Sequence, residues 1–251
     1  MKIKNKKSSH VGMIISFVVF ITFIVFLYSV IRPAISTGQD KKTIADYLVV
    51  KIIENVSSNL TSTSIEIDSH HNPNKDCIIL KNIMAISELV PEPPIPYMII
   101  KNEDGNEQEA HNNYPTFDAD LKIMRDSRSD KFFRIYYSPE FPRLISDSTS
   151  GCRAIELNDY SISIIKTGKF SFESNLNYLI NHYEGNYEQL KTELNVPPGT
   201  EFGFGFIQSN GTRIDVGEIP STADVYAAEI PIQYIDNSVN IQSGFINIKV
   251  W

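Results

Sequence analysis

The chain has 251 residues, 42% of them hydrophobic, which is enough for a packed core in one domain or two small ones. It carries 23 basic and 30 acidic residues, a net charge of −7. This balance argues against nucleic acid as a partner, because nucleic acids attract basic surfaces.

Residues 11–31 read VGMIISFVVFITFIVFLYSVI and contain no charged side chain. A helix of that length spans about 30 Å, the thickness of the hydrocarbon core of a bilayer. The competing interpretation is a secretory signal peptide, which has a shorter apolar part and small residues at its cleavage point. The length of the apolar run and the absence of an Ala-x-Ala pattern favour a retained single-pass anchor, with the lipid bilayer as its partner.

The orientation follows from the flanks of this stretch. Four lysines, Lys2, Lys4, Lys6 and Lys7, precede it, so we expect the N-terminus in the cytoplasm and the C-terminal part outside the membrane. Without these lysines, 19 basic residues stand against 30 acidic ones, a net charge of −11. Such a balance is typical of a soluble, exposed surface.

Cys77 and Cys152 both lie on the expected extracytoplasmic side. In an oxidising compartment they could form a disulfide, and two separate buried thiols are the alternative. Three N-x-S/T sequons begin at Asn55, Asn59 and Asn210, and this topology would expose them to N-glycosylation.

The segment after the anchor predicts a second helix. Pro33 is expected to kink or end the first one. Apolar residues then recur every fourth position over residues 42–60, which indicates an amphipathic helix that packs one face against a partner. The repeating positions are Ile44, Leu48, Ile52, Val56 and Leu60.

From Thr63 onward the pattern favours strands. An acidic, Asn-rich stretch at residues 103–113 reads as an exposed loop. The prolines of residues 91–96 could mark a boundary, although a single head is preferred. Strands are expected at residues 64–68, 77–80, 97–101, 131–137, 154–157 and 160–165.

The last third predicts two short helices and two strand pairs. Helices are expected at residues 172–183 and 186–194, the second opened by a capping box of Asn186 and Gln189. Asn210-Gly211 separates two strands, residues 202–206 and 213–216, as in a β-hairpin. A second pair covers residues 225–235 and 239–251 and should dock the C-terminus in a sheet.

These elements predict an α+β fold in four parts. They are a basic leader (1–10), an apolar helix (11–32), a juxtamembrane amphipathic helix (33–62) and a mostly antiparallel, β-rich extracytoplasmic head (63–251).

No catalytic, cofactor-binding or metal-binding residue is assigned from the sequence. His70, His71, Cys77 and His111 are the only grouping that suggests a metal, but their spacing fits no zinc motif, and exposed loop histidines are the simpler interpretation. His182 is interpreted as a helix-end or surface residue. We therefore expect a non-enzymatic protein without a cofactor.

A membrane-tethered enzyme or small-molecule-binding domain is the alternative. It would require several polar side chains to converge on one pocket, and the candidates are His70, His71, His111 and Asp215.

The Lys-rich leader, the apolar helix with its amphipathic extension and the β-rich head together resemble archaeal type IV pilin-related proteins. In that family a peptidase cuts before the apolar segment, commonly after a glycine, and Gly12-Met13 is the matching place. The resemblance implies a minor pilin-like structural or interaction protein. Its partners would be copies of itself or other pilin-like subunits, bound through the N-terminal helix. A permanently anchored relative that keeps its leader fits the same residues.

Overall fold

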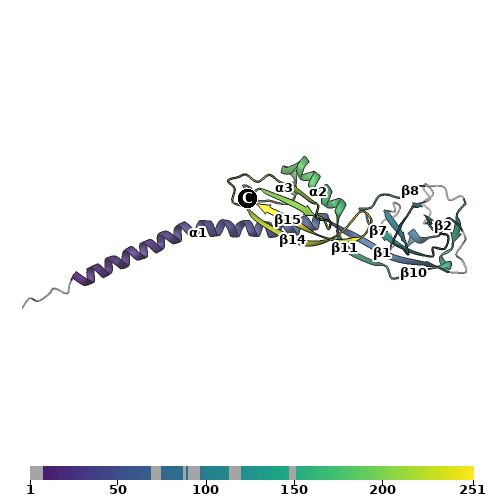
Figure 1. Ribbon diagram of the computed structural model, residues 1–251, viewed down its shortest axis with the longest axis horizontal. Coiled ribbons are helices and arrows are strands. Elements are labelled where there is room, and N and C mark those ends of the chain that lie inside the picture. The colour runs from purple at the N-terminus through teal and green to yellow at the C-terminus, as the bar shows by residue number, and fades with distance from the viewer. Residues whose placement is uncertain (1–7, 69–74, 87–88, 90–96, 113–119, 147–150) are drawn as a thin grey trace, which may run out of the picture.

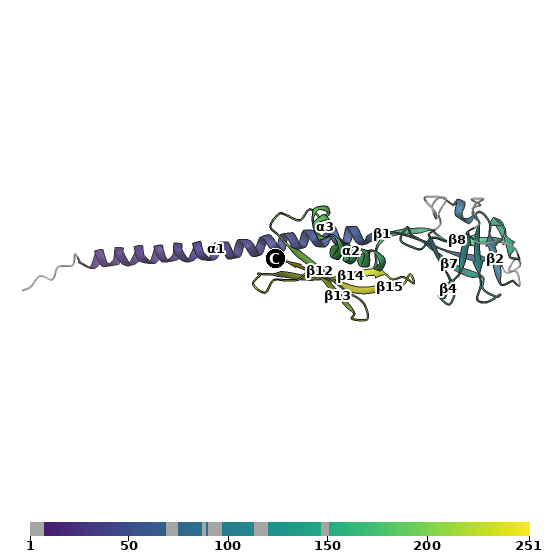
Figure 2. The same ribbon diagram turned by 90° about the horizontal axis from the view of Figure 1, so that it is seen from above.

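The computed structural model describes residues 8–68, 75–86, 89, 97–112, 120–146 and 151–251. The molecule is elongated, with the helix α1 (Ser8–Val56) projecting from one end of a two-lobed head (Figures 1 and 2). The proximal lobe contains the second half of α1 and the chain from residue 166 onward, and the distal lobe contains most of the chain between residues 61 and 165. The fold is α+β, with a mostly antiparallel β-rich head.

Helix α1 differs from the expected pair of helices. It runs without interruption past Pro33, so the helix does not end there as the sequence allowed. Apolar residues precede this proline, and residues packed in the head follow it. Both favour a continuous helix by more than proline costs through its one missing backbone hydrogen bond.

The second helix was also expected to reach Leu60, but α1 ends at Val56. Strand β1 (Ser57–Ile67) begins at the next residue. Its serines and threonines are poor helix formers, and they gain strand partners on both sides.

Strand β1 lies near the middle of the larger sheet, which within the described residues has ten strands. Their order is β13-β12-β15-β14-β11-β1-β7-β3-β4, with β10 also paired to β1. The pairs are antiparallel except β11 with β14. Besides β1, the strands are β3 (Met98–Asn102), β4 (Glu107–Gln108), β7 (Phe132–Tyr137), β10 (Tyr160–Ile162), β11 (Lys166–Phe172), β12 (Phe202–Ile207), β13 (Arg213–Val216), β14 (Tyr226–Ile235) and β15 (Ile241–Val250).

A second sheet belongs to the distal lobe alone. The described part has five strands in the order β8-β5-β6-β2-β9. They are β2 (Cys77–Leu80), β5 (Ala110–Asn112), β6 (Leu121–Met124), β8 (Ile145–Ser146) and β9 (Arg153–Ile155), and two 3₁₀ turns, η1 (Ile83–Ala85) and η2 (Leu157–Asp159), lie in the same lobe.

The C-terminal third follows the prediction closely. Helices α2 (Glu173–Gly185) and α3 (Tyr187–Glu193) form, and β12–β13 and β14–β15 are antiparallel hairpins. The side chain of Asn186 donates to Gln189 Oε1 at 2.7 Å rather than capping the helix backbone. The C-terminus is docked, since Trp251 and Glu201 exchange two backbone hydrogen bonds of 2.9 Å.

The predicted loop at residues 103–113 is wrong in its second half. Strands β4 and β5 form there, and Gln108 and His111 are buried because the two sheets of the distal lobe take up this segment. Two other strands, β6 and β11, carry too few consecutive apolar residues to stand out as strands in the sequence.

Each lobe has its own core, and a small apolar cluster joins them. Leu60, Ile99, Phe141, Phe172, Ile235 and Val239 form this junction. The loop between β14 and β15 adds a polar contact across it, since Lys101 Nζ donates to Asn240 Oδ1 at 3.0 Å. The boundary considered at residues 91–96 lies outside the described residues.

Candidate functional site

The first half of α1 is an exposed apolar rod. Gly12–Ser29 has a mean hydropathy of 2.4, and none of it is buried against the rest of the chain. Met13, Phe17 and Phe26 expose 73%, 65% and 63% of their surface. At 1.5 Å per residue this stretch measures about 27 Å, so the helix is long and apolar enough to cross a bilayer.

Two hydroxyl groups in this rod, those of Thr22 and Ser29, hydrogen-bond to carbonyls of the helix itself. Thr22 Oγ1 donates to the carbonyls of Val18 and Val19, at 3.0 and 2.9 Å, and Ser29 Oγ donates to that of Phe26 at 2.8 Å. Both hydroxyls therefore have acceptors inside the helix, and neither needs water.

The second half of α1 is built into the proximal lobe. Ala45, Leu48, Ile52 and Val56 are completely buried, at the three- and four-residue spacing that places them on one helix face. They share a core with α2, α3 and the strands β12–β15, which Figure 2 shows alongside this part of the helix. Lys41 Nζ adds a hydrogen bond of 2.7 Å to the carbonyl of Asp224. One continuous helix therefore forms the apolar rod and enters the head, with no flexible linker between them.

The two cysteines lie together in the distal lobe. Cys77 and Cys152 form a disulfide with an S–S distance of 2.03 Å, across 75 residues of sequence. The parallel pairing of β2 with β9 brings them together, since Ile78 lies opposite Arg153.

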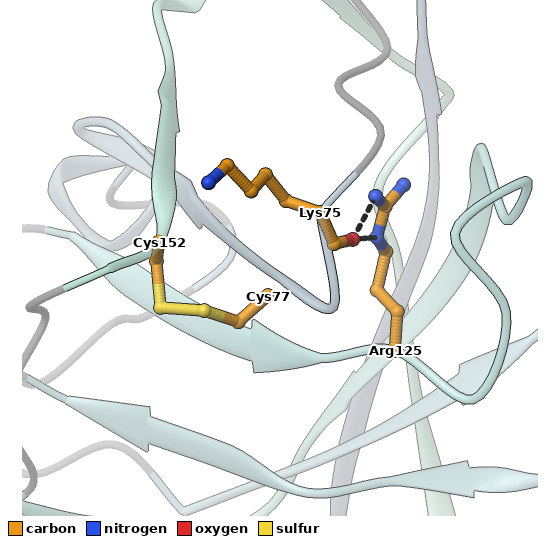
Figure 3. Close-up of a disulfide and its surroundings, with 4 residues drawn as sticks. All are labelled: Lys75, Cys77, Arg125 and Cys152. Carbon is orange, nitrogen blue, oxygen red and sulfur yellow. Dashed lines mark hydrogen bonds between the residues drawn. A yellow bond between two sulfur atoms is a disulfide. The ribbon is translucent and has the colours of Figure 1, made fainter.

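Arg125 supports the segment that leads into Cys77. Its guanidinium donates through Nε and Nη2 to the carbonyl of Lys75, and Nη1 donates to the carbonyl of Asp130 at 2.9 Å. Figure 3 shows this guanidinium and the disulfide on opposite sides of the segment that holds Lys75. Burial lowers the pKa of Arg125, although the charges of Asp130 and Asp76 oppose the shift.

The three predicted glycosylation sites lie in different surroundings. Asn55 is in the last turn of α1, where its side chain donates to the carbonyl of Lys51 at 2.9 Å. Asn59 is in β1, opposite Lys169 of β11. Asn210 is exposed in the turn between β12 and β13, where its Oδ1 accepts the backbone N–H of Thr212. Only Asn210 combines exposure with a turn.

The predicted cleavage place lies in the second turn of α1. Gly12 and Met13 are both helical and follow the helix start at Ser8 by one turn. A Cβ added at Gly12 would meet nothing within 4 Å.

The polar residues considered for a binding pocket do not come together where the structure describes them. His111 lies in the distal five-stranded sheet, and Asp215 lies in β13 at the far edge of the larger sheet. His70 and His71 fall outside the described residues. Within the described chain, no group of three or more His, Cys, Asp or Glu side chains could hold a metal ion.

Of the described histidines, His111 differs from its interpretation as an exposed loop residue. His111 is 8% exposed, so its expected exposure is wrong, and its Nε2 lies 3.0 Å from Glu109 Oε1. His182, in the last turn of α2, has Nδ1 3.8 Å from Glu193 Oε2 on α3. Asp215 is engaged with Arg213 and Lys249.

A tyrosine network that no sequence pattern predicts ties α2 and α3 to the start of β12. Tyr183 Oη donates to the carbonyl of Phe202, and Tyr187 Oη donates to Glu201 Oε2, each at 2.6 Å. Tyr187 also accepts the backbone N–H of Phe202 at 3.1 Å. Burial raises the pKa of Tyr183 to about 12, and burial followed by the hydrogen bond to Glu201 raises that of Tyr187. Both phenols are thus held neutral as structural donors.

Comparisons with protein-family models, with curated proteins and with solved structures found no match to this chain. The geometry of α1 and of the head is therefore the basis for any functional assignment.

Proposed function

We propose that this protein is a membrane-anchored, extracytoplasmic structural or interaction protein of minor pilin-like build. One observation carries the proposal. The same 49-residue helix exposes a charge-free apolar half and buries one face of its other half in the head. Exposed apolar surface of this size is costly in water, so it needs lipid or other apolar helices around it.

The flanking charges and the cysteines support the proposed orientation. The four N-terminal lysines favour a cytoplasmic leader. A disulfide persists in oxidising compartments, which fits a head outside the cytoplasm.

The continuous helix supports the pilin-like part of the proposal. Because α1 enters the head without a linker, neighbouring subunits that pack their apolar halves would hold their heads at a fixed orientation. A permanent anchor uses the same helix in the bilayer. The two versions differ in whether residues 1–12 are removed.

The anchor is tested by membrane fractionation with a matched pair of variants. Ile21→Lys places a charge at the middle of the apolar half, where it costs about 3 kcal/mol of insertion free energy. Val50→Lys places the same charge on an exposed position of the same helix inside the head region. The wild type and Val50→Lys should stay in carbonate-washed membranes, and Ile21→Lys should lose much of its membrane fraction.

N-terminal sequencing then separates the two versions. Mature protein that begins at Met13 and is recovered from sheared filaments supports the subunit, and protein that keeps Met1 in membranes supports the permanent anchor. Full-length wild-type protein that stays soluble without lipid would overturn both.

A further inference from the structure

A polar trough of about 680 Å³ lies on the distal part of the larger sheet, where β7, β1 and β11 run side by side. Its lining includes Ser62 and Ser64 from β1, Arg134 and Tyr136 from β7, and Ser163 and Lys166 from the approach to and start of β11. The lining positions within the strands, Ser62, Ser64, Arg134, Tyr136 and Lys166, lie opposite one another in the register and so share one face of the sheet, while Thr63 and the loop residues Ser163 and Ile164 complete the lining.

The pairing register places these side chains in two rows. Ser62 lies opposite Tyr136 on one side and Lys166 on the other. Ser64 lies opposite Arg134, and its carbonyl accepts the backbone N–H of Ser163 at 2.9 Å. The trough thus has hydroxyl groups along its floor and one cation on each side.

The charges in the trough are unbalanced. Arg134 and Lys166 both line it, and its lining contains no Asp or Glu, although acidic residues outnumber basic ones in the chain. Neither cation makes an ion pair or hydrogen bond with another side chain in the part of the chain that the structure describes. The same holds for the hydroxyls of Ser62, Ser64 and Tyr136. Five polar side chains therefore face one hollow with their hydrogen-bonding capacity unused.

A second hollow, between the end of α1 and helices α2 and α3, differs from the trough because its polar side chains contact one another. It is lined by His182, Gln189 and Glu193 among others. Its polar groups engage one another, since Gln189 Nε2 donates to Glu193 Oε1 at 2.7 Å and His182 lies 3.8 Å from the same carboxylate group. That hollow is explained by the packing of α2 on α3.

The spacing of the cations restricts the ligand. Arg134 and Lys166 stand two strands and two residues apart, which places their Cα atoms about 12 Å from each other. The two cations therefore start from different strands on opposite sides of the trough, where each can reach a separate acidic group of one extended molecule.

The backbone pairing and the small apolar surface of the trough restrict the ligand further. Strand β1 is hydrogen-bonded on both sides along the trough, so an added peptide strand finds no free edge there. Ile164 is the one aliphatic side chain in the lining, which leaves little to bury an apolar peptide anchor. Hydroxyl groups between separated cations complement a molecule that is itself rich in hydroxyls and carries carboxylates.

We propose that this trough binds an acidic oligosaccharide, with its carboxylates at Arg134 and Lys166 and its hydroxyls at Ser62, Ser64 and Tyr136. The inference goes beyond the proposed function, and it does not depend on whether α1 anchors or assembles the protein.

Calorimetric titration of the full-length protein in detergent micelles tests it. The probe is tetragalacturonate, and its fully methyl-esterified form is the control ligand because it keeps the hydroxyls and loses the charges. The acid should bind, and the ester should bind at least about tenfold more weakly. Arg134→Gln and Lys166→Gln should each weaken binding of the acid by about tenfold. Both side chains are exposed, so neither change should affect folding.

Lys169→Gln is the matched control variant. Lys169 is an exposed cation of the same strand, three residues from Lys166, and its side chain lies on the opposite face of the sheet. This variant should bind the acid like the wild type.

Equal binding of acid and ester, no effect of either trough variant, or an equal effect of Lys169→Gln would overturn the proposal. Tighter binding of a Glu-rich peptide than of the uronate would overturn the carbohydrate assignment. None of these results would bear on membrane fractionation, so failure here is separate from failure of the anchor.

Discussion

The carboxylate of Asp215 lies across the backbone of Gly205 in the neighbouring strand. A Cβ added to Gly205 would collide with Asp215 Oδ1 and would lie 2.9 Å from its Cγ. The carboxylate is held there by Arg213 and by Lys249, whose Nζ is 3.5 Å from Oδ1. A glycine in the middle of a strand weakens it in general, and here it makes room for an ion-paired side chain.

Gly205→Ala should therefore destabilise the proximal lobe by about 1–3 kcal/mol, because the added methyl group displaces Asp215 from its two cations. Urea unfolding measures the change. Gly185→Ala is the control, since a Cβ there meets nothing within 4 Å, and it should leave stability unchanged or slightly higher. If steric conflict with Asp215 is the cause, Gly205→Ala combined with Asp215→Ala should cost less than the sum of the single changes. Strict additivity would contradict this reading.

The disulfide should contribute about 4 kcal/mol to stability, because it closes a loop of 75 residues. The double variant Cys77→Ser, Cys152→Ser should lower the urea midpoint, and a reducing agent should lower that of the wild type similarly. The double variant should not respond to the reducing agent. If complete reduction leaves the urea midpoint of the wild type unchanged, the bridge does not stabilise the distal lobe.

Stability should also fall in acid through Glu201. The hydrogen bond from Lys191, followed by that from Tyr187, lowers the pKa of its carboxyl below the ordinary value of 4.5. Because the folded state holds the ionised form, this contribution is present above pH 4.5 and is lost as the pH falls through the lowered pKa.

Urea midpoints at pH 7 and pH 3 test this dependence in the wild type and in Glu201→Gln. The variant should lose stability at pH 7 and show a smaller drop toward pH 3. Glu193→Gln is a useful comparison, since that carboxylate lies on α3 and accepts a hydrogen bond from Gln189, whereas Tyr187 and Lys191 donate to Glu201. An identical acid response of wild type and Glu201→Gln would refute the assignment.

Glycosylation, if the native host modifies the chain, should occur at Asn210 rather than at Asn55 or Asn59. Asn210 is exposed in a turn and uses its Oδ1 in the local hydrogen bond, whereas Asn55 is helical and donates its Nδ2 to Lys51, and Asn59 lies within a paired strand. Intact-mass measurement should show a shift that Asn210→Gln removes. Asn55→Gln should keep the shift. Modification found at Asn55 or Asn59 alone would contradict the expectation.

Much of the helical and C-terminal structure was predictable because it depends on local patterns. The buried face of α1 at Leu48, Ile52 and Val56 follows the four-residue repeat, and Asn210-Gly211 marks a hairpin that forms. Pro33 misled the prediction, because a local rule takes no account of the long apolar run before it or of the packed helix face after it. The last turn expected at Leu60 failed for a similar reason, since the strand partners of β1 come from residues far away in sequence.

The candidate sites were less predictable. The trough depends on the register of three strands, and Arg134, Ser64 and Lys166 have no shared sequence signature. The Tyr187–Glu201 contact likewise arises only when α3 packs beside β12. Buried His111 shows the reverse error, because its polar segment resembles a loop in the sequence and becomes a strand only by pairing with the distant strand β6.

Strands β1 and β11 lie side by side, with Ser62 opposite Lys166, yet the chain makes the whole distal lobe between them. The chain therefore enters and leaves the distal lobe through two paired, neighbouring strands. Joining Ser62 to Lys166 by a tight turn would delete the distal lobe and keep the proximal core, but it would remove Ile99 and Phe141 from the junction. The distal lobe is thus an insertion between two paired strands of the larger sheet, and the junction contacts of Ile99, Phe141 and Lys101 fasten it to the proximal lobe.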